Sequence, residues 1–533
     1  MPTVREATFD LFRKQGMTTM FGNPGSTELP MLKDFPDDFE YVLGLQEAAV
    51  VGMADGYAQV TGKPALVNLH TAPGLGNAMG ALFNAQANHS PVVITVGQQA
   101  RSMITMQSNL TNRDAIRVPH PYVKFAYEPP RAEDVPLAIA HAIHLASLPP
   151  MGPVMVSLPM DDWDKEIDAS DAQHVINRQV SGRAGADPAL IADLAERLKS
   201  AKNPIAVAGP DVDASGAWEE MIALAENQNL GVWAPPATGG GRLGFPEDHP
   251  HWRGVLPPAV GPVGETLKEH DLILVVGSSV FAYYPNIPGP FLAEGSSLVQ
   301  ITSDPDEAAR APMGDSIVAD VKLTLTALLA ELGEKSGREA PPEWPKPTRM
   351  EETDPLNSSV IHSILREQLP DNGIVVLESP SSTMALRNQL RISKPNSYFF
   401  GAGGGLGFGL ASAVGIQIAE PERPVVCVLG EGSVQYAVAA FWSAVAYDVP
   451  VTFLVLRNEE YAILKWFAEI EQVSGSPGLD LPALESAKIA SGYGIESSLV
   501  RSATEVEAAL KEAIADPKPR LIEVPVQPGM SLF

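Results

Sequence analysis

The stretch Pro424-Val-Val-Cys-Val-Leu-Gly-Glu-Gly-Ser433, followed by Val451-Thr-Phe-Leu-Val-Leu-Arg-Asn458, contains two apolar runs that each end in polar residues. Such runs predict buried strands. Glu431 and Asn458 follow them and lie 27 residues apart, which fits one strand–helix–strand unit. The strands of this unit run parallel, so their carboxyl ends meet at the edge where open α/β sheets bind ligands. A carboxylate, an amide oxygen and main-chain carbonyls there predict a site for Mg²⁺ and a diphosphate.

Similar apolar runs recur along the whole chain and alternate with amphipathic stretches. This alternation predicts an α/β fold in which mostly parallel sheets are flanked by helices. The expected strands are Ala65–Leu69, Val92–Val96, Val154–Leu158, Ile205–Ala208, Leu272–Val276, Leu298–Ile301, Ile374–Leu377, Val425–Leu429 and Thr452–Leu456. The expected helices include Val135–Ala146, Pro188–Ser200 and Lys322–Glu331.

Two polar segments interrupt the alternation, and both are expected to connect domains. Asp161–Arg183 is rich in Asp, Gln and Ser, whereas Gly333–Asn357 is rich in proline and charged residues. The 533 residues exceed the size of one hydrophobic core. We therefore expect three domains, at 1–180, 181–340 and 341–533, each with its own mostly parallel sheet.

The bulk properties narrow the classes of function. The net charge of −27 argues against nucleic acid and anionic membranes as partners. Cys427 is the single cysteine and lies in an apolar run, so it is expected to be a packed strand residue. We find no signal-peptide pattern and no apolar run of membrane-spanning length, so we expect a cytoplasmic enzyme.

The first third contains a second group of polar residues at expected element ends. Asn23-Pro24-Gly25-Ser26 forms a turn, Glu47 begins a helical stretch, and His70 follows an expected strand. By themselves Glu47 reads as a helix-capping carboxylate and His70 as a strand-end histidine. The last third adds the glycine-dense turn Gly403–Gly407 before a helix, which favours a functional site there.

Together these motifs resemble those of thiamine-diphosphate enzymes of the decarboxylase and acetolactate-synthase superfamily, and within it most resemble benzoylformate decarboxylases. The resemblance extends over nearly the whole chain. It is carried by Asn23–Ser26, Leu45–Ala48, Asn68–His70, Ala115–Lys124, Gly209–Ala214, Glu307–Asp315, Gly404–Phe408 and Lys465–Phe467. It implies a pyrimidine-binding, a central and a diphosphate-binding domain, with active sites between the subunits of a homodimer or homotetramer.

The resemblance also implies residue roles. Glu47 would hydrogen-bond the cofactor's pyrimidine from the neighbouring subunit, Leu406 would hold the cofactor bent, and Ser26 and His70 would face the substrate. The implied cofactor contacts are Glu47, Ser381, Gly404, Leu406, Gly432, Ser433 and Tyr461. The implied ligands of Mg²⁺, or of Ca²⁺ in its place, are Glu431, Asn458 and Glu460. The implied substrate wall is Phe400, Ile463, Leu464 and Phe467.

The expected activity is the non-oxidative decarboxylation of a 2-oxo acid to an aldehyde and CO₂, with a carboligase side activity. The expected partners are therefore a 2-oxo acid and an aldehyde. One alternative is a carboligase or lyase, such as an acetolactate synthase or a benzaldehyde lyase. Others are a flavin-dependent oxidase of the same superfamily, and a homologue that binds the cofactor without catalysis.

Several residues depart from the family pattern. Glu431 stands where the family usually has Asp, and Arg457 replaces an Asn. The hypothesis is that Arg457 pairs with Glu460, and the alternative is that the Glu460 side chain faces solvent. Tyr284 takes the place of a second histidine. A phenol titrates at about 10 and an imidazole at about 6.5, so Tyr284 is the poorer proton shuttle and carboligation should be favoured. Ile463 replaces a smaller residue, so aliphatic 2-oxo acids are further candidate substrates.

Overall fold

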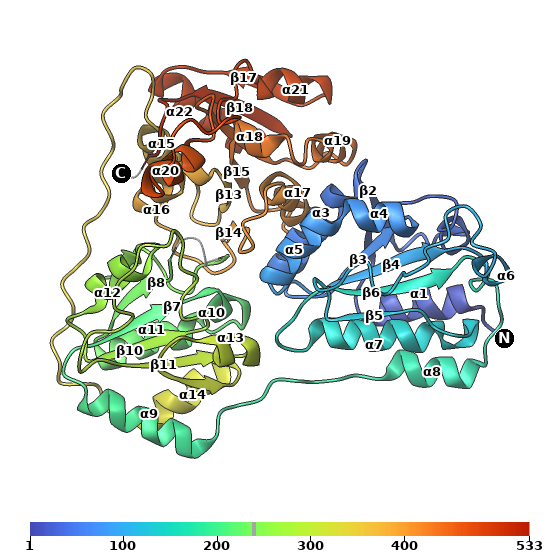
Figure 1. Ribbon diagram of the computed structural model, residues 1–533, viewed down its shortest axis with the longest axis horizontal. Coiled ribbons are helices and arrows are strands. Elements are labelled where there is room, and N and C mark those ends of the chain that lie inside the picture. The colour runs from blue at the N-terminus through green and yellow to red at the C-terminus, as the bar shows by residue number, and fades with distance from the viewer. Residues whose placement is uncertain (237–240, 532–533) are drawn as a thin grey trace.

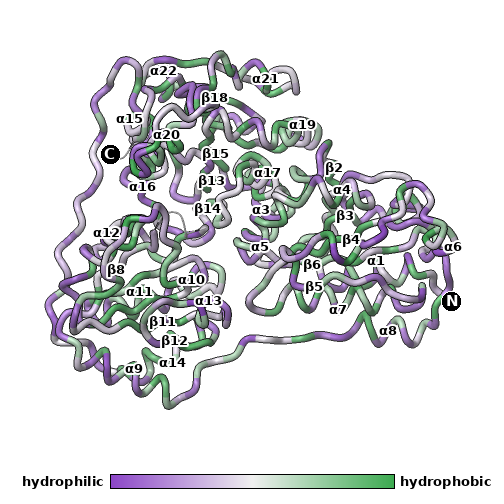
Figure 2. The backbone as a smooth tube through the Cα atoms, viewed as in Figure 1, coloured by the Kyte–Doolittle hydropathy of each residue, from purple (hydrophilic) through white to green (hydrophobic). Residues whose placement is uncertain are grey.

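The computed structural model describes residues 1–236 and 241–531 and contains three lobes, each built on a six-stranded sheet (Figure 1). Every strand pairing within the three sheets is parallel. Figure 2 shows hydrophobic residues concentrated inside the lobes and many hydrophilic residues along the two long connections. The predicted α/β class is confirmed.

The first lobe carries the sheet order β2-β1-β3-β4-β6-β5. Its strands are β1 (Thr19–Asn23), β2 (Glu40–Leu43), β3 (Ala65–Leu69), β4 (Val92–Gln98), β5 (Phe125–Tyr127) and β6 (Val154–Pro159). Its helices are α1 (Val4–Lys14), α2 (Leu29–Leu32), α3 (Glu47–Thr61), α4 (Thr71–Asn77), α5 (Met79–Ala87), α6 (Arg101–Ile104), η1 (Ala132–Asp134), α7 (Val135–Ser147) and α8 (Ala169–Asn177).

The central lobe carries the sheet order β12-β11-β10-β7-β8-β9. Its strands are β7 (Pro204–Ala208), β8 (Gly231–Ala234), β9 (Trp252–Val255), β10 (Leu272–Val276), β11 (Ser297–Thr302) and β12 (Asp315–Val318). Its helices are α9 (Pro188–Ser200), α10 (Pro210–Ala214), α11 (Trp218–Gln228), α12 (Val260–Leu267), α13 (Pro305–Arg310) and α14 (Val321–Leu332).

The third lobe carries the sheet order β14-β13-β15-β16-β18-β17. Its strands are β13 (Ile374–Glu378), β14 (Tyr398–Phe400), β15 (Val425–Gly430), β16 (Thr452–Arg457), β17 (Glu496–Leu499) and β18 (Arg520–Pro525). Its helices are α15 (Ser358–Gln368), η2 (Pro380–Ser382), α16 (Thr383–Gln389), α17 (Phe408–Ala419), α18 (Glu431–Val434), α19 (Ala439–Ala446), α20 (Ala462–Ile470), α21 (Ser486–Gly492) and α22 (Ala503–Ala515).

The central strands are buried along their whole length, because helices cover both faces of a parallel sheet. Every residue of β3, β10 and β16 is buried, which explains their unbroken apolar runs. Cys427 lies in β15 with no exposed surface, and burial raises the pKa of its thiol well above the usual value. The expectation of a packed strand cysteine is confirmed.

No helix among residues 1–236 and 241–531 combines the length and apolarity needed to cross a bilayer.

The expected connector at 161–183 is partly wrong, because it contains helix α8. Asp168 caps this helix by accepting the N–H groups of Ser170 and Asp171, and Ala172 and Ile176 are buried in the first lobe. The chain then crosses to the central lobe in extended form, and the segment 333–357 returns to the third lobe without helix or strand (Figure 1). The domain boundaries at 180 and 340 fall in these two crossings and stay predictions.

Helices α3 and α17 join the first and third lobes at very close range (Figure 1). Small residues make this approach possible. A Cβ added to Gly56 would lie 2.3 Å from Ser412 O, and one added to Gly415 would lie 1.8 Å from Met53 O. The Ser412 hydroxyl also donates to Gly52 O at 3.0 Å. The main chains of the two helices are therefore in direct contact.

We expect Gly415→Ala to destabilise the chain by about 1–3 kcal/mol, because the new methyl group meets main-chain atoms that cannot rotate away. Denaturant unfolding would measure the loss. Gly492→Ala is the matched control, since a Cβ at this residue of α21 meets nothing within 4 Å. Equal unfolding midpoints for Gly415→Ala and the unmodified chain would contradict the direct contact.

Candidate active site

Glu47 is the first residue of α3, and its carboxylate is held by two asparagines. Asn23 Nδ2 donates to Oε1 at 3.1 Å, and Asn77 Nδ2 donates to Oε2 at 3.0 Å. The side chain of Gln46, not that of Glu47, caps the helix by accepting the Ala49 N–H. The simple reading of Glu47 as a helix cap is therefore wrong. With 8% of its surface exposed, this carboxylate is fixed in orientation and nearly dry.

His70 follows β3 and is oriented by a buried carboxylate. Its Nδ1 lies 2.8 Å from Glu28 Oε2, and Glu28 is 1% exposed. The same carboxylate accepts the Gly25 N–H at 2.8 Å and the Thr27 hydroxyl at 2.7 Å. Because an ionised carboxylate only accepts hydrogen bonds, Nδ1 carries the proton and Nε2 is left as the basic nitrogen.

Glycines let these two side chains line one surface. A Cβ on Gly25 would lie 2.2 Å from His70 Nδ1, so only glycine fits against the ring. A Cβ on Gly74 would lie 3.3 Å from Glu47 Oε1 and 3.5 Å from His70 Cβ. Glu47 and His70 therefore flank the same point of α4, and Ser26 is exposed in the loop beside them.

Glu431 and Asn458 lie at the carboxyl ends of neighbouring strands, as the sequence predicts. Gly430 of β15 pairs with Leu456 of β16, and Glu431 directly follows the first of these residues. Glu431 is 2% exposed, and its Oε1 accepts the Glu459 N–H at 2.7 Å. Burial raises the pKa of the Glu431 carboxyl, although main-chain hydrogen bonds and Arg457 oppose this. A bound cation would compensate the charge of so dry a carboxylate.

The donor set at these strand ends fits Mg²⁺. The Asn458 amide oxygen accepts the Glu460 N–H at 3.3 Å and so lies beside the main chain of that residue. Glu459 has φ +60°, a left-handed conformation that turns the chain sharply at this point. A carboxylate, an amide oxygen and a main-chain carbonyl are hard oxygen donors, which Mg²⁺ and Ca²⁺ both prefer.

The expected pairing of Arg457 with Glu460 is wrong. Arg457 Nη1 lies 2.8 Å from Glu523 Oε1, because β18 pairs with β16 and presents Glu523 on the same side. Glu460 instead pairs with Lys465 Nζ and accepts the Gly529 N–H at 2.6 Å. The charge of Arg457 is thus met by another strand.

The expected diphosphate contacts gather at the same edge of the third sheet. A Cβ on Gly432 would lie 2.9 Å from the Tyr461 ring, so only glycine lets this tyrosine approach. Ser433 is buried in α18. Ser381 lies in η2 after β13, which neighbours β15, and its carbonyl accepts the Ser531 N–H at 2.9 Å.

The glycine-rich turn that carries Leu406 is clamped from two sides. Asn84 of the first lobe exchanges two hydrogen bonds with the main chain of Gly405, at 2.9 and 3.0 Å. Gly404 and Gly407 have φ of +71° and +102°, conformations that glycine adopts without strain. Leu406 is half-buried between the two clamped glycines, as a fixed apolar wedge requires.

Glu378 is the second clamp. Its carboxyl oxygens accept the N–H groups of Gly407, Phe408 and Gly409, at 2.5, 3.2 and 2.9 Å. Complete burial raises the pKa of Glu378 to about 8, although the three donors lower it. The carboxyl group thus caps α17 from inside the protein.

Sequence reasoning missed four supporting residues. Asn23 stands in a quoted motif without an assigned role, and no role is assigned to Asn77, Glu28 or Glu378. Glu28 and His70 lie 42 residues apart, and Glu378 and Gly407 lie 29 apart. Separations of this kind leave no local pattern from which the pairing could be inferred.

The expected substrate wall stays accessible. Within α20 only Ala462 is buried, Ile463 is half-buried and Leu464 is 44% exposed. The ring of Phe467 packs on Tyr284 of the central lobe, with centroids 4.5 Å apart. The half-buried Phe400 ends the edge strand β14.

Tyr284, 54% exposed, thus lies at the substrate wall rather than beside His70. Over the described ranges 1–236 and 241–531, no hydrogen bond or ion pair joins the group of Glu47 and His70 to that of Glu431 and Asn458. The residues form two half-sites, one in the first lobe and one in the third.

Comparison with known proteins matches three family models to the three lobes. They are described as the N-terminal TPP binding domain, the central domain and the C-terminal TPP binding domain of thiamine pyrophosphate enzymes, at residues 2–116, 191–328 and 380–524. A benzoylformate decarboxylase of Pseudomonas aeruginosa is 49% identical over 528 residues, with 99% of both chains covered. A probable acetolactate synthase large subunit of Methanocaldococcus jannaschii is 26% identical, with 99% of this chain and 92% of the relative covered.

Two solved structures cover the whole chain and are themselves wholly covered. The thiamine diphosphate-dependent 4-hydroxybenzoylformate decarboxylase of Rhodococcus jostii RHA1 is 45% identical, with a TM-score of 0.96. The benzoylformate decarboxylase of Polynucleobacter necessarius is 43% identical, with a TM-score of 0.97.

The buried Glu378 predicts a pH dependence of stability. Its pKa is about 8 in the folded chain against an ordinary 4.5, so between these values the folded chain holds a proton that the unfolded chain lacks. The stability that this proton contributes is complete below pH 4.5 and is lost as the pH rises through 8.

We expect the melting temperature of the unmodified chain to fall, relative to that of Glu378→Gln, between pH 5.5 and about 8.5. Differential scanning calorimetry across this range is the measurement. Glu471→Gln makes the same change at an exposed residue and should leave the dependence of the melting temperature on pH unaltered. If the melting temperatures of the unmodified chain and of Glu378→Gln change in parallel with pH, the raised pKa of Glu378 is refuted.

Proposed function

The chain belongs to the thiamine pyrophosphate enzyme family, and we propose that it decarboxylates an aryl 2-oxo acid such as benzoylformate to an aldehyde and CO₂. Its class, a thiamine-diphosphate-dependent carboxy-lyase, follows from the three family models and the 49% identity to a benzoylformate decarboxylase along 99% of the chain. The observation that carries the proposal is the Glu47 carboxylate, held by two amides beside an oriented His70.

Thiamine diphosphate, when bound, supplies a nucleophilic carbon and accepts the electron pair that CO₂ leaves behind. In our proposal Glu47 holds a proton on the aminopyrimidine, and its nearly dry surroundings strengthen that hydrogen bond. Glu431, Asn458 and the Glu460 carbonyl hold Mg²⁺. Gly432, Ser433, Tyr461 and Ser381 would contact the diphosphate, and Leu406 and Gly404 would support the cofactor.

On the substrate side, the geometry supports different roles for His70 and the aromatic wall. Because Glu28 engages Nδ1, His70 would turn Nε2 to the substrate and, with Ser26, orient its carboxylate and carbonyl oxygen. The accessible rings of Phe467 and Tyr284 and the side chains of Phe400, Ile463 and Leu464 suit an aryl group, because aromatic rings pack well on one another.

We further propose that the two half-sites meet between subunits of a homodimer or homotetramer. The supporting observation is that, within the described part of one chain, Glu47 makes no polar contact with the third-lobe group. Met103, Met106 and Ile116 also expose apolar surface on one loop region of the first lobe, which suits a subunit contact. The cytoplasmic location stays a prediction.

A panel of 2-oxo acids tests the proposed substrate class. With thiamine diphosphate and Mg²⁺, we expect kcat/KM for CO₂ release from benzoylformate to exceed that for pyruvate at least tenfold, because the wall is aromatic and apolar. Glu47→Gln keeps the side-chain size but removes the charge, and should lower kcat on the order of 10²-fold or more. A preference for pyruvate or 2-oxobutanoate would overturn the aryl assignment.

The same enzyme should make hydroxyketones when an aldehyde is added, because the Tyr284 phenol is a poor proton donor at neutral pH. We expect Tyr284→His to raise the ratio of aldehyde to hydroxyketone, measured by chiral chromatography of the products. Tyr284→Phe keeps the ring on Phe467 and should preserve the original ratio. An unchanged ratio of aldehyde to hydroxyketone in Tyr284→His would show that Tyr284 does not control proton transfer in this reaction.

A further inference from the structure

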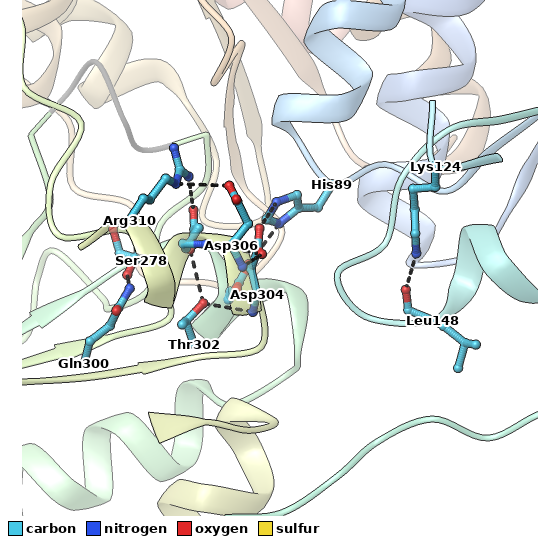
Figure 3. A network of polar contacts seen from close by, with 11 residues as sticks. His89, Lys124, Leu148, Ser278, Gln300, Thr302, Asp304, Asp306 and Arg310 are labelled. Atoms are coloured by element: carbon cyan, nitrogen blue, oxygen red, sulfur yellow. Dashed lines mark hydrogen bonds and ion pairs between the residues drawn. The ribbon is translucent and has the colours of Figure 1, made fainter. Parts of the chain in front are cut away.

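A second polar cluster lies where the first lobe meets the central lobe, away from the half-sites described above. His89 follows α5 with φ +53° and projects toward the carboxyl ends of the central strands. Figure 3 shows its imidazole beside the Asp304 carboxylate. His89, Asp211 and Glu307 also line a cavity of about 510 Å³ between the lobes.

The distances in this cluster are long for ion pairs. His89 Nε2 lies 3.5 Å from Asp304 Oδ2, and His89 Nδ1 lies 3.8 Å from Asp211 Oδ1. A charge-assisted hydrogen bond would bring such atoms to about 2.7–2.9 Å. Two ligands each about 2.1 Å from one tetrahedral ion lie roughly 3.4 Å apart. The separation of Nε2 and Oδ2 therefore fits two ligands of a shared ion.

Asp304 and Glu307 each have one carboxylate oxygen engaged in a local hydrogen bond. The other oxygen of each is left turned toward the cluster. Asp304 uses Oδ1 to cap α13, accepting the N–H groups of Asp306 and Glu307 at 2.7 and 3.3 Å, and leaves Oδ2 facing His89. Glu307 Oε2 accepts the Thr302 hydroxyl at 3.1 Å. Ligand atoms of His89, Asp304 and Glu307 all lie within 4.8 Å of one another.

The cluster also holds more carboxylates than cations. Three carboxylates face one imidazole, and Asp211 Oδ2 is buried with no hydrogen-bond partner among the described residues. Arg310 contacts a carboxylate of the cluster, whereas Lys124 is engaged elsewhere. Lys124 Nζ donates to the Leu145 and Leu148 carbonyls, and the exposed Arg310 reaches Glu307 Oε1 only at 3.5 Å.

The two other arginines near the cavity are also paired. Arg183 pairs with Asp320 at 2.8 Å, and Arg242 pairs with Asp213 at 2.8 Å. A cation bound by Asp304 and Glu307 would offset the excess of carboxylates in the cluster.

We propose that His89 Nε2, Asp304 and Glu307 bind a divalent transition-metal ion such as Zn²⁺ or Mn²⁺, with Asp211 on the Nδ1 side of the ring. One imidazole with carboxylates is a ligand set that such ions accept. A carboxylate on the far nitrogen of a ligating histidine is the usual second partner. The site differs from the one at Glu431, which offers oxygen donors alone.

The proposed ion would connect the three lobes. Asn88 precedes His89, and its Oδ1 accepts the Ala402 N–H at 2.9 Å, at the start of the turn that carries Leu406. Its Nδ2 donates to Asp55 at 2.8 Å. An ion at His89 would thus restrain a residue that supports the cofactor turn. This link to the cofactor rests on the proposed function, whereas the metal site does not.

Manganese binding to the full-length chain tests the proposal directly. Glu431→Gln is used as the background, so that the oxygen-only site is weakened, and the protein is freed of metal with EDTA before Mn²⁺ alone is added. We expect one Mn²⁺ per chain and a histidine nitrogen coupling in pulsed EPR spectra. This readout needs neither thiamine diphosphate nor turnover, so it stands apart from the proposed decarboxylation.

Adding His89→Lys should abolish the nitrogen coupling and weaken Mn²⁺ binding at least tenfold, because lysine keeps a positive charge but loses the imidazole ligand. Asp304→Asn should also weaken binding. His249→Gln is the control, because His249 lies outside the cluster. Its Nε2 pairs with Glu226 Oε1 at 3.3 Å. Absence of a nitrogen-coupled ion, or equal Mn²⁺ affinity in the His89→Lys protein, would show that His89 is an ion-pair partner only and overturn the proposal.

Discussion

The contact between α3 and α17 fixes the positions on which the rest of the site depends. Glu47 is the first residue of α3, and the turn of Leu406 immediately precedes α17. A Cβ on Gly52 would lie 2.7 Å from Ala411 Cβ and 3.8 Å from Gly407 O, so the two helices touch near both of these starting points. In the proposed subunit arrangement, Glu47 and Leu406 of one chain belong to two different active sites, so a shift between the helices would disturb both sites. The glycines on this interface are therefore part of the functional geometry.

Buried carboxylates supply the fixed orientation inside this frame. Glu28, Glu47 and Glu378 are each held by several hydrogen-bond donors: Glu28 by Gly25 and Thr27 of its own loop and by His70, Glu47 by two asparagine amides, and Glu378 by three main-chain N–H groups. Burying a carboxyl group is favourable only when such partners are present. Glu431 has main-chain donors on one side, and it also lies where a cation can balance its charge.

The sequence predicts what depends on local order and misses what depends on tertiary contact. The apolar runs ending at Gly430 and Arg457 locate adjacent strand ends, because residues at the end of a parallel strand share an edge with those of its neighbour. Glu28 pairs with His70 and Arg457 pairs with Glu523, in each case between different elements. The periodicity of the sequence does not predict such pairs. Helix α8 is not predicted from the sequence, because it has only two buried residues, Ala172 and Ile176, among polar ones.

The central lobe contacts the first and third lobes near the proposed site residues, although it holds neither half-site. Through Tyr284 it packs on Phe467 of α20, and through Asp211 and Asp304 it faces His89 beside the turn that supports Leu406. The extended connections to this lobe leave its position to be set by such contacts. The proposed substrate wall and the turn that carries Leu406 therefore both depend on the placement of the central lobe.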